Sequence, residues 1–116
     1  MLAPASDVRI YLFNGHTDMR KGAASLALLV GNLLSDPAGR TRMFVFRGKN
    51  AGKIKILWWE AQGFCLFYKC FDKGRFIWPT ATEKGSIGIT RAQLSMLLEG
   101  IDWRQPTWSN PPEYVG

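Results

Sequence analysis

The sequence predicts an α+β fold, a single domain with an antiparallel β-meander of about four or five strands and two covering α-helices. Three observations point to it. Short β-branched and aromatic runs follow one another with turn residues between them, two segments repeat apolar residues at helical spacing, and 116 residues are the length of one domain. We expect residues 1–105 to form that domain and the Pro-rich residues 106–116 to form a flexible tail.

The first predicted elements are a strand and a helix. Val8–Phe13 is rich in β-branched and aromatic residues, and the turn residues Asn14 and Gly15 follow it. A helix is predicted where apolar residues repeat at i, i+3, i+4, i+7 and i+8, and Ser35–Gly39 ends it. These apolar positions are Leu26, Leu29, Val30, Leu33 and Leu34.

The middle of the chain predicts consecutive strands. Met43–Phe46 and Lys53–Trp59 flank a segment that contains Asn and two glycines, which is a hairpin signal. Phe64–Phe71 and Arg75–Trp78 follow after short turns, and Pro79 ends the last of them. Consecutive strands with short connections pair antiparallel, so we predict a meander here.

The last predicted element is a helix. We expect Thr80–Gly88 to be a loop, because Gly, Ser and charged residues occupy it. Thr90 and Gln93 then have the spacing of a capping box, and Gly100 stands where a C-terminal glycine cap belongs. The apolar face of this helix is predicted to consist of Leu94, Leu97, Leu98 and Ile101.

Positive charge is concentrated in the middle of the chain. There are 15 Lys and Arg residues against nine Asp and Glu, which gives a net charge of +6. Nine of these bases lie between Arg40 and Arg75, together with two acids. Because clustered Lys and Arg bind phosphates and release counterions, this segment favours a nucleic-acid partner. No apolar run approaches the ~18 residues of a membrane span and no signal peptide is visible, so we expect a cytoplasmic protein with no membrane partner.

Few residues suit catalysis. His16 is the only histidine, and no Ser or Cys nucleophile is evident beside it. The acids have no metal-motif spacing, although their number keeps a small metal-dependent nuclease as a third alternative. Cys65 and Cys70 are too far apart along one strand for a disulfide, so we expect buried free thiols. We therefore predict no enzyme, no catalytic residue, no metal, no cofactor and no small-molecule substrate.

The hairpin and sheet offer a binding surface. Arg47 and Lys49 lie at the hairpin tip, while Lys53 and Lys55 share one face of the following strand. A two-stranded ribbon fits the major groove, and its tip can straddle phosphates. The adjacent residues Trp58 and Trp59 face opposite sides of the sheet, so both are buried only if both faces are covered. We predict a partner surface at this pair of tryptophans.

Five motifs between Val8 and Pro106 make the chain similar to a known family. They are Asp18–Gly22, Phe44–Gly48, Ile54–Trp59, Gly74–Pro79 and Gln93–Trp103. With them the chain resembles TnpB, the small second-open-reading-frame accessory protein of IS66-type bacterial insertion sequences. The RNA-guided nucleases that share the name TnpB are unrelated. The resemblance implies a role in transposition beside a separate transposase that carries the catalytic acids.

Two hypotheses follow. The first is a non-catalytic accessory protein of transposition that binds DNA through its basic residues, with the transposase and other accessory proteins of the element as partners. The second is a protein-interaction module that docks on the transposase without touching DNA. Asp18 is predicted to orient its surroundings by capping the next helix or pairing with an arginine. The predicted nucleic-acid contacts are Arg20, Lys21, Arg47, Lys49, Lys53, Lys55 and Arg75.

Overall fold

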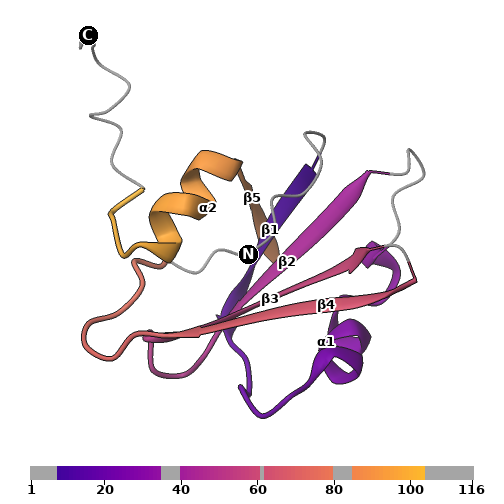
Figure 1. Cartoon of the computed structure of the whole chain (residues 1–116), viewed down its shortest axis with the longest axis horizontal. Helices are drawn as coiled ribbons and strands as arrows, with labels where there is room; N and C mark the ends of the chain where they lie inside the picture. Colours follow the sequence, from indigo (N-terminus) through magenta and orange to yellow (C-terminus); the bar gives the residue numbers. More distant parts are fainter. Residues whose placement is uncertain (1–7, 35–39, 61, 80–84, 104–116) are drawn as a thin grey trace, which may run out of the picture.

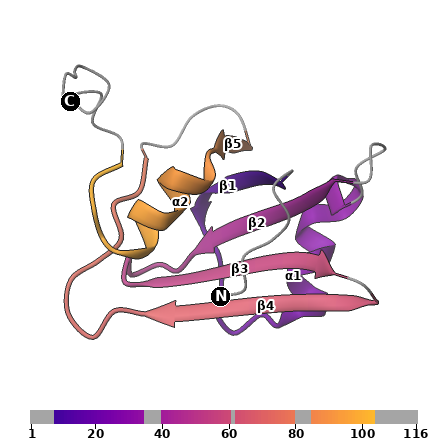
Figure 2. The same cartoon turned by 45° about the horizontal axis from the view of Figure 1, so that its top comes forward.

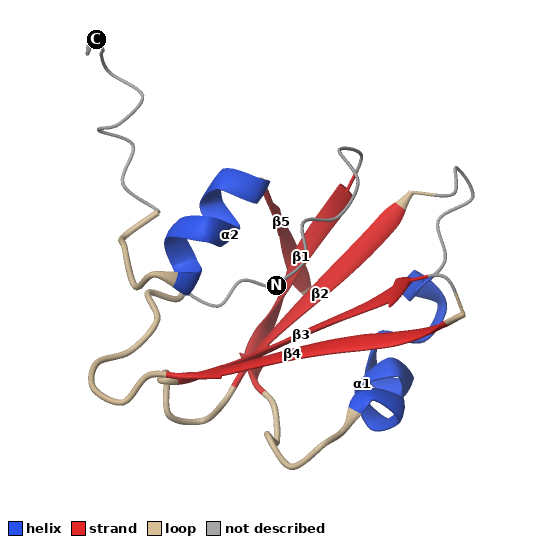
Figure 3. Ribbon diagram, in the orientation of Figure 1, coloured by secondary structure: helices blue, strands red, loops and turns tan. Residues whose placement is uncertain are grey.

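The computed structural model describes residues 8–34, 40–60, 62–79 and 85–103. Five strands form one sheet in the order β4-β3-β2-β1-β5, and the two helices lie on opposite faces of it (Figures 1 and 3). The predicted α+β class is therefore confirmed. In chain order the elements are β1 (Val8–His16), α1 (Ala23–Val30), the 3₁₀ helix η1 (Gly31–Leu34), β2 (Thr41–Arg47), β3 (Lys53–Glu60), β4 (Gly63–Cys70), β5 (Ser86–Ile89) and α2 (Arg91–Leu98).

The connection from β1 to β2 differs from a meander. Strands β2, β3 and β4 pair antiparallel as predicted, but β1 pairs parallel with β2. A parallel pair needs a crossover that returns the chain to the same end of the sheet, and α1 with η1 lies in that crossover. As a result β1 and β2 finish at the same end of the sheet, which matters for the placement of the functional side chains.

Two strand predictions were wrong near the end of the chain. Arg75–Trp78 is not a strand: Phe76 is buried and stacks on Phe71 at 4.2 Å between ring centroids, so this segment packs on the sheet instead of pairing. Ser86–Ile89 is β5 and pairs antiparallel with β1, although Ser86–Gly88 was expected in a loop. Its four residues include Gly88, which leaves too short an apolar pattern to predict a strand.

Two glycines change the limits of the first elements. Strand β1 continues past the expected turn to His16 through an irregularity in register, where Gly15 has φ +72°. Helix α1 ends at Val30 because Gly31 has φ +60°, and a 3₁₀ turn follows. Leu29 and Leu33, which were predicted on the buried face, are both exposed.

The core has two parts, one on each face of the sheet. On one face α1 buries Leu26 and Val30 against the strand residues Phe44, Phe46 and Leu57. On the other face Leu94 and Leu97 of α2 pack against a larger apolar cluster of the strands. Both faces are thus covered, so consecutive residues of the central strands are buried even though their side chains point to opposite faces. That cluster contains Ile10, Leu12, Met43, Val45, Ile54, Ile56, Trp58, Phe76 and Trp103.

The capping box predicted at the start of α2 is present. The Thr90 hydroxyl accepts a hydrogen bond from the Gln93 amide at 3.1 Å, and the Gln93 side-chain oxygen accepts one from the Thr90 amide at 2.9 Å. At the other end Gly100 has φ +77°, as expected of a residue that follows a helix. Within the described residues, neither helix is long and apolar enough to cross a membrane.

Replacing Thr90 by Ala is expected to destabilise the protein by about 1 kcal/mol, because the Gln93 amide loses its side-chain acceptor. Urea unfolding followed by circular dichroism measures this loss. Thr90→Ser retains the hydroxyl and serves as the control, with a loss of less than about 0.5 kcal/mol expected. Equal losses in the two variants would contradict the capping role of the hydroxyl.

Candidate nucleic-acid interface

Three loops meet at one end of the sheet, and together they carry most of the predicted binding residues. Strands β1, β2 and β4 finish at this end and β3 begins there, so residues 17–22, 48–52 and 71–79 lie side by side, at the lower left of the sheet in Figure 1. We call this region the basic end. Its Lys and Arg residues, in the loops and at the adjoining strand ends, are Arg20, Lys21, Arg47, Lys49, Lys53, Lys73 and Arg75.

The hairpin loop is fixed to the loop that follows β1. The Thr17 amide donates to the Arg47 carbonyl at 2.7 Å. Gly48 lies so close to Met19 that a Cβ at position 48 would stand 2.8 Å from the Met19 Cγ. Only glycine fits this approach without displacement of the neighbour.

The hairpin loop is also fixed to the loop that follows β4. The Phe71 amide donates to the Gly52 carbonyl at 2.8 Å, and the Phe76 amide donates to the Ala51 carbonyl at 2.6 Å. Backbone hydrogen bonds thus hold the hairpin between its two neighbours. The cations of the three loops are therefore presented on a defined scaffold.

Lys55 is a buried structural residue and not the exposed nucleic-acid contact that the sequence had predicted. Its residue is only 7% exposed. The ammonium donates to the carbonyls of Met19 and Lys21, both at 2.8 Å, and lies 4.7 Å from the centre of the Tyr68 ring. Because α1 and its preceding loop cover this face of β3, the side chain supports the loop of Arg20 and Lys21 instead of facing a ligand.

Arg20 and Asp18 form a bidentate ion pair. The Arg20 guanidinium donates to both carboxylate oxygens, with a shortest distance of 2.7 Å, and the Arg20 amide donates to Oδ1 at 2.9 Å. These bonds hold the pKa of Asp18 well below its ordinary value and raise that of Arg20. Of the two roles predicted for Asp18, the structure shows the arginine pairing. Helix α1 has Gly22 at its N-cap and no side-chain cap.

Arg47 and Arg75 come together with an aromatic ring beside the hairpin. They line a hollow of about 230 Å³ with Ala51, Phe76 and Trp78. The Arg47 guanidinium carbon lies 5.9 Å from the centre of the Trp78 ring, and its Nε donates to the Gly15 carbonyl at 3.3 Å. A hollow lined by two arginines and a tryptophan suits a phosphate with its attached sugar or base.

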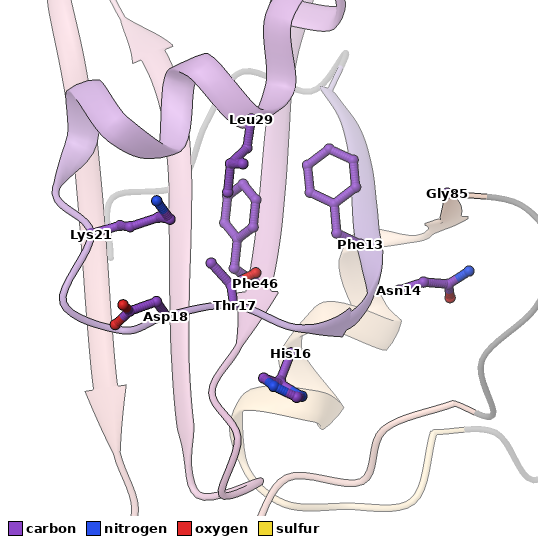
Figure 4. Close-up of a pocket in the computed structure, with 9 residues that line it drawn as sticks. All are labelled: Phe13, Asn14, His16, Thr17, Asp18, Lys21, Leu29, Phe46 and Gly85. Carbon is purple, nitrogen blue, oxygen red and sulfur yellow. The ribbon is translucent and has the colours of Figure 1, made fainter.

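Lys21 lines a second cavity, of about 340 Å³, between the loop and α1. Figure 4 shows it pointing from the loop toward Phe46, with Leu29 entering from the helix. Asp18 and His16 also line this cavity, and neither Ser nor Cys is among its described lining residues. In contrast, Lys49, Lys53, Lys73 and Arg75 are exposed.

The two tryptophans of β3 have different environments. Trp58 is buried on the α2 face, and its indole N–H donates to Glu60 Oε1 at 3.0 Å, so it is no partner surface. Trp59 is 47% exposed and meets Phe64 edge to face, with 4.8 Å between the ring centroids. Trp59 lies near the end of β3, which finishes at Glu60.

The cysteine prediction was half right. Cys65 and Cys70 are both free, but neither is fully buried: Cys65 is half-buried, and Cys70 is exposed on the edge strand β4. Among the described residues, no three His, Cys, Asp or Glu side chains are grouped so that they could hold a metal ion.

Two features of the surface were not predicted from the sequence. Lys73, which is not among the predicted contacts, lies in a loop of the basic end. The side chains of Phe64, Leu66 and Tyr68 form an exposed stripe on β4. Their alternation in the sequence was visible, but the position of β4 at the sheet edge was not.

Comparisons with known proteins identify relatives along almost the whole chain. A family model described as IS66 Orf2 like protein matches residues 8–108. The uncharacterized protein y4hO of Sinorhizobium fredii (strain NBRC 101917 / NGR234) is 48% identical over 116 residues, the full length of both chains. The uncharacterized protein y4jC of the same strain is 33% identical over 104 residues, 89% of this chain and 87% of its own. No solved structure matches.

Proposed function

This chain belongs to the IS66 Orf2-like family of insertion-sequence accessory proteins, and from that premise we propose that it acts in transposition by binding DNA at the basic end. The observation that supports this proposal is the gathering of seven Lys and Arg residues on three loops and the adjoining strand ends, with the hairpin hydrogen-bonded to both neighbouring loops. Those loops carry two acids, Asp18 and Asp72, and Asp18 is already paired with Arg20. The region therefore has a strong positive excess.

The proposed contacts are with the DNA backbone. Lys49, Lys53 and Arg75 are exposed and have the charge to neutralise phosphates. The Arg47–Arg75 hollow would receive one phosphate group, with Trp78 beside the sugar or an unpaired base. Such contacts fix position along DNA with little reading of sequence.

The proposed role is non-catalytic and cytoplasmic. Asp18 keeps its negative charge at any ordinary pH, because Arg20 holds its pKa low. In this proposal Asp18 orients Arg20 and the loop and takes no part in proton transfer. Sequence preference and the joining of DNA strands would then come from other proteins of the element.

The test is a titration of a fluorescent duplex with the protein at increasing salt. If four of the cations contact phosphates, the affinity should fall by about 100-fold between about 50 mM and about 200 mM salt. Absence of binding at the lowest salt, or an affinity independent of salt, would contradict the proposal. The rival role is docking on the transposase without DNA. In that case the protein would still capture the transposase in a pull-down after nuclease has removed any bridging DNA.

A further inference from the structure

Strand β4 presents an unprotected edge. Among the described strands it pairs with β3 alone, and Figure 2 shows it at the outer margin of the sheet. Exposed edges are usually blocked by charge, proline or a bulge. The pairing of β4 with β3 is continuous, and residues 63–68 contain no charge and no proline. Its one cation, Lys69, donates to the Leu98 carbonyl at 2.6 Å and so is turned toward its own chain.

The outward backbone groups of β4 belong to the same residues as its exposed side chains. The Phe71 amide bonds to Gly52, and hydrogen-bonded pairs alternate along an antiparallel ladder. Residues 65, 67 and 69 therefore direct their N–H and C=O groups toward β3. Those of Phe64, Leu66 and Tyr68 point away from the sheet.

We propose that β4 pairs antiparallel with β4 of a second copy of this chain, across a two-fold axis at Leu66. The segment Phe64–Leu66–Tyr68 has an aromatic residue at each end and Leu at its centre, so it is complementary to itself when reversed. Leu66 would face Leu66 of the second copy, and Phe64 would face its Tyr68. All three positions would be hydrogen-bonded pairs, which gives about six backbone hydrogen bonds.

The buried surface indicates the strength of this dimer. Trp59, Phe64 and Tyr68 are 47%, 38% and 46% exposed, and Leu66 is 37% exposed. Side chains of this size leave roughly 60–100 Å² each to be covered, so the four from each of two copies can bury at most about 500–800 Å² before the backbone edge is added. This is the range of weak interfaces, so we expect a monomer–dimer equilibrium at micromolar concentration.

Dimerisation leaves the proposed DNA contacts accessible. Five residues separate Leu66 from Phe71, where the basic end begins, and this corresponds to roughly 17 Å along a strand. The two basic ends of the dimer would lie at opposite ends of the joined sheet. The dimer is therefore tested without DNA, and its outcome is independent of the proposed function.

Sedimentation velocity between about 2 µM and about 200 µM tests the proposal. The mass should rise from monomer to dimer with concentration, and Leu66→Lys should shift the equilibrium at least about 20-fold toward monomer by placing two like charges at the axis. Ile101→Lys is the matched control: Ile101 is 48% exposed and follows α2, on the opposite face of the sheet. A chain that stays monomeric throughout, or a dimer that both variants weaken equally, would overturn the proposal.

A cross-link tests the register separately. In a Cys70→Ser background, Leu66→Cys should form a disulfide-linked dimer on mild oxidation, because directly paired residues have Cα atoms about 5.5 Å apart. Ile101→Cys should not cross-link under the same conditions. Cross-linking only at Ile101→Cys would overturn the proposal. The proposal would also be overturned if the outward amides of β4 exchanged freely at high protein concentration and became protected only when the transposase was added.

Discussion

Replacing Lys49, Lys53 and Arg75 together by Ala is expected to reduce DNA affinity by several hundred-fold at about 0.1 M salt. Each phosphate contact contributes about 0.9 to the slope of log affinity against log salt, so three lost contacts should reduce that slope by about 2.7. All three side chains are exposed, and the fold should change in stability by no more than about 0.5 kcal/mol per substitution. Arg47 is left in place because its guanidinium donates to the Gly15 carbonyl.

The control for this variant separates position from net charge. Lys49→Ala with Lys53→Ala removes two positive charges at the basic end. Arg9→Ala with Arg91→Ala removes two from exposed positions at the start of β1 and the start of α2. Duplex titrations at matched salt should show a loss of slope near 1.8 in the first double variant and much less in the second. Equal losses would mean that the overall charge, and not the basic end, attracts DNA.

The existence of the basic end depends on a connection that the sequence pattern did not predict. In a strict meander β1 and β2 would be antiparallel, and the loop with Arg20 and Lys21 would lie at the opposite end of the sheet from the hairpin. The parallel pairing brings them together, through the 2.7 Å bond between Thr17 and Arg47. Residue alternation predicts that a strand exists, but it carries no information on the direction of its neighbour.

Local patterns were reliable where local energetics decide the structure. The hairpin between β2 and β3 and the capping box of Thr90 were predicted because turn residues and caps act over a few residues. The segment Arg75–Trp78 failed for a tertiary reason. Its aromatic residues suit a strand, but Phe76 gains more by packing on Phe71 and under α2 than by forming a ladder.

Side-chain roles were hardest to predict where the same residue type recurs. Lys53 and Lys55 have the same charge and share a face of β3, so no sequence feature distinguishes their roles. Burial separates them, because the loop before α1 covers Lys55 and leaves Lys53 exposed. A long aliphatic stem allows lysine to serve in either position.

Replacing Lys55 by Met is expected to destabilise the protein by about 2–3 kcal/mol, a decrease of roughly 10–15 °C in melting temperature. Methionine retains an apolar stem of similar length but not the ammonium, so the carbonyls of Met19 and Lys21 lose the donor that now lies 2.8 Å from each. Removal of both members of a buried polar pair can be neutral, but here the acceptors are backbone groups and cannot be removed.

Lys53→Met is the matched control for this prediction, since it removes the same charge from an exposed position two residues earlier on β3. Its free energy of unfolding in urea should change by no more than about 0.5 kcal/mol. Hydrogen exchange adds a local readout: the amides of Thr17 and Lys21, which bond to Arg47 and Asp18, should exchange faster in Lys55→Met and not in Lys53→Met. Equal stability of the two variants would mean that water replaces the ammonium at the two carbonyls. The structural role assigned to the Lys55 ammonium would then be wrong.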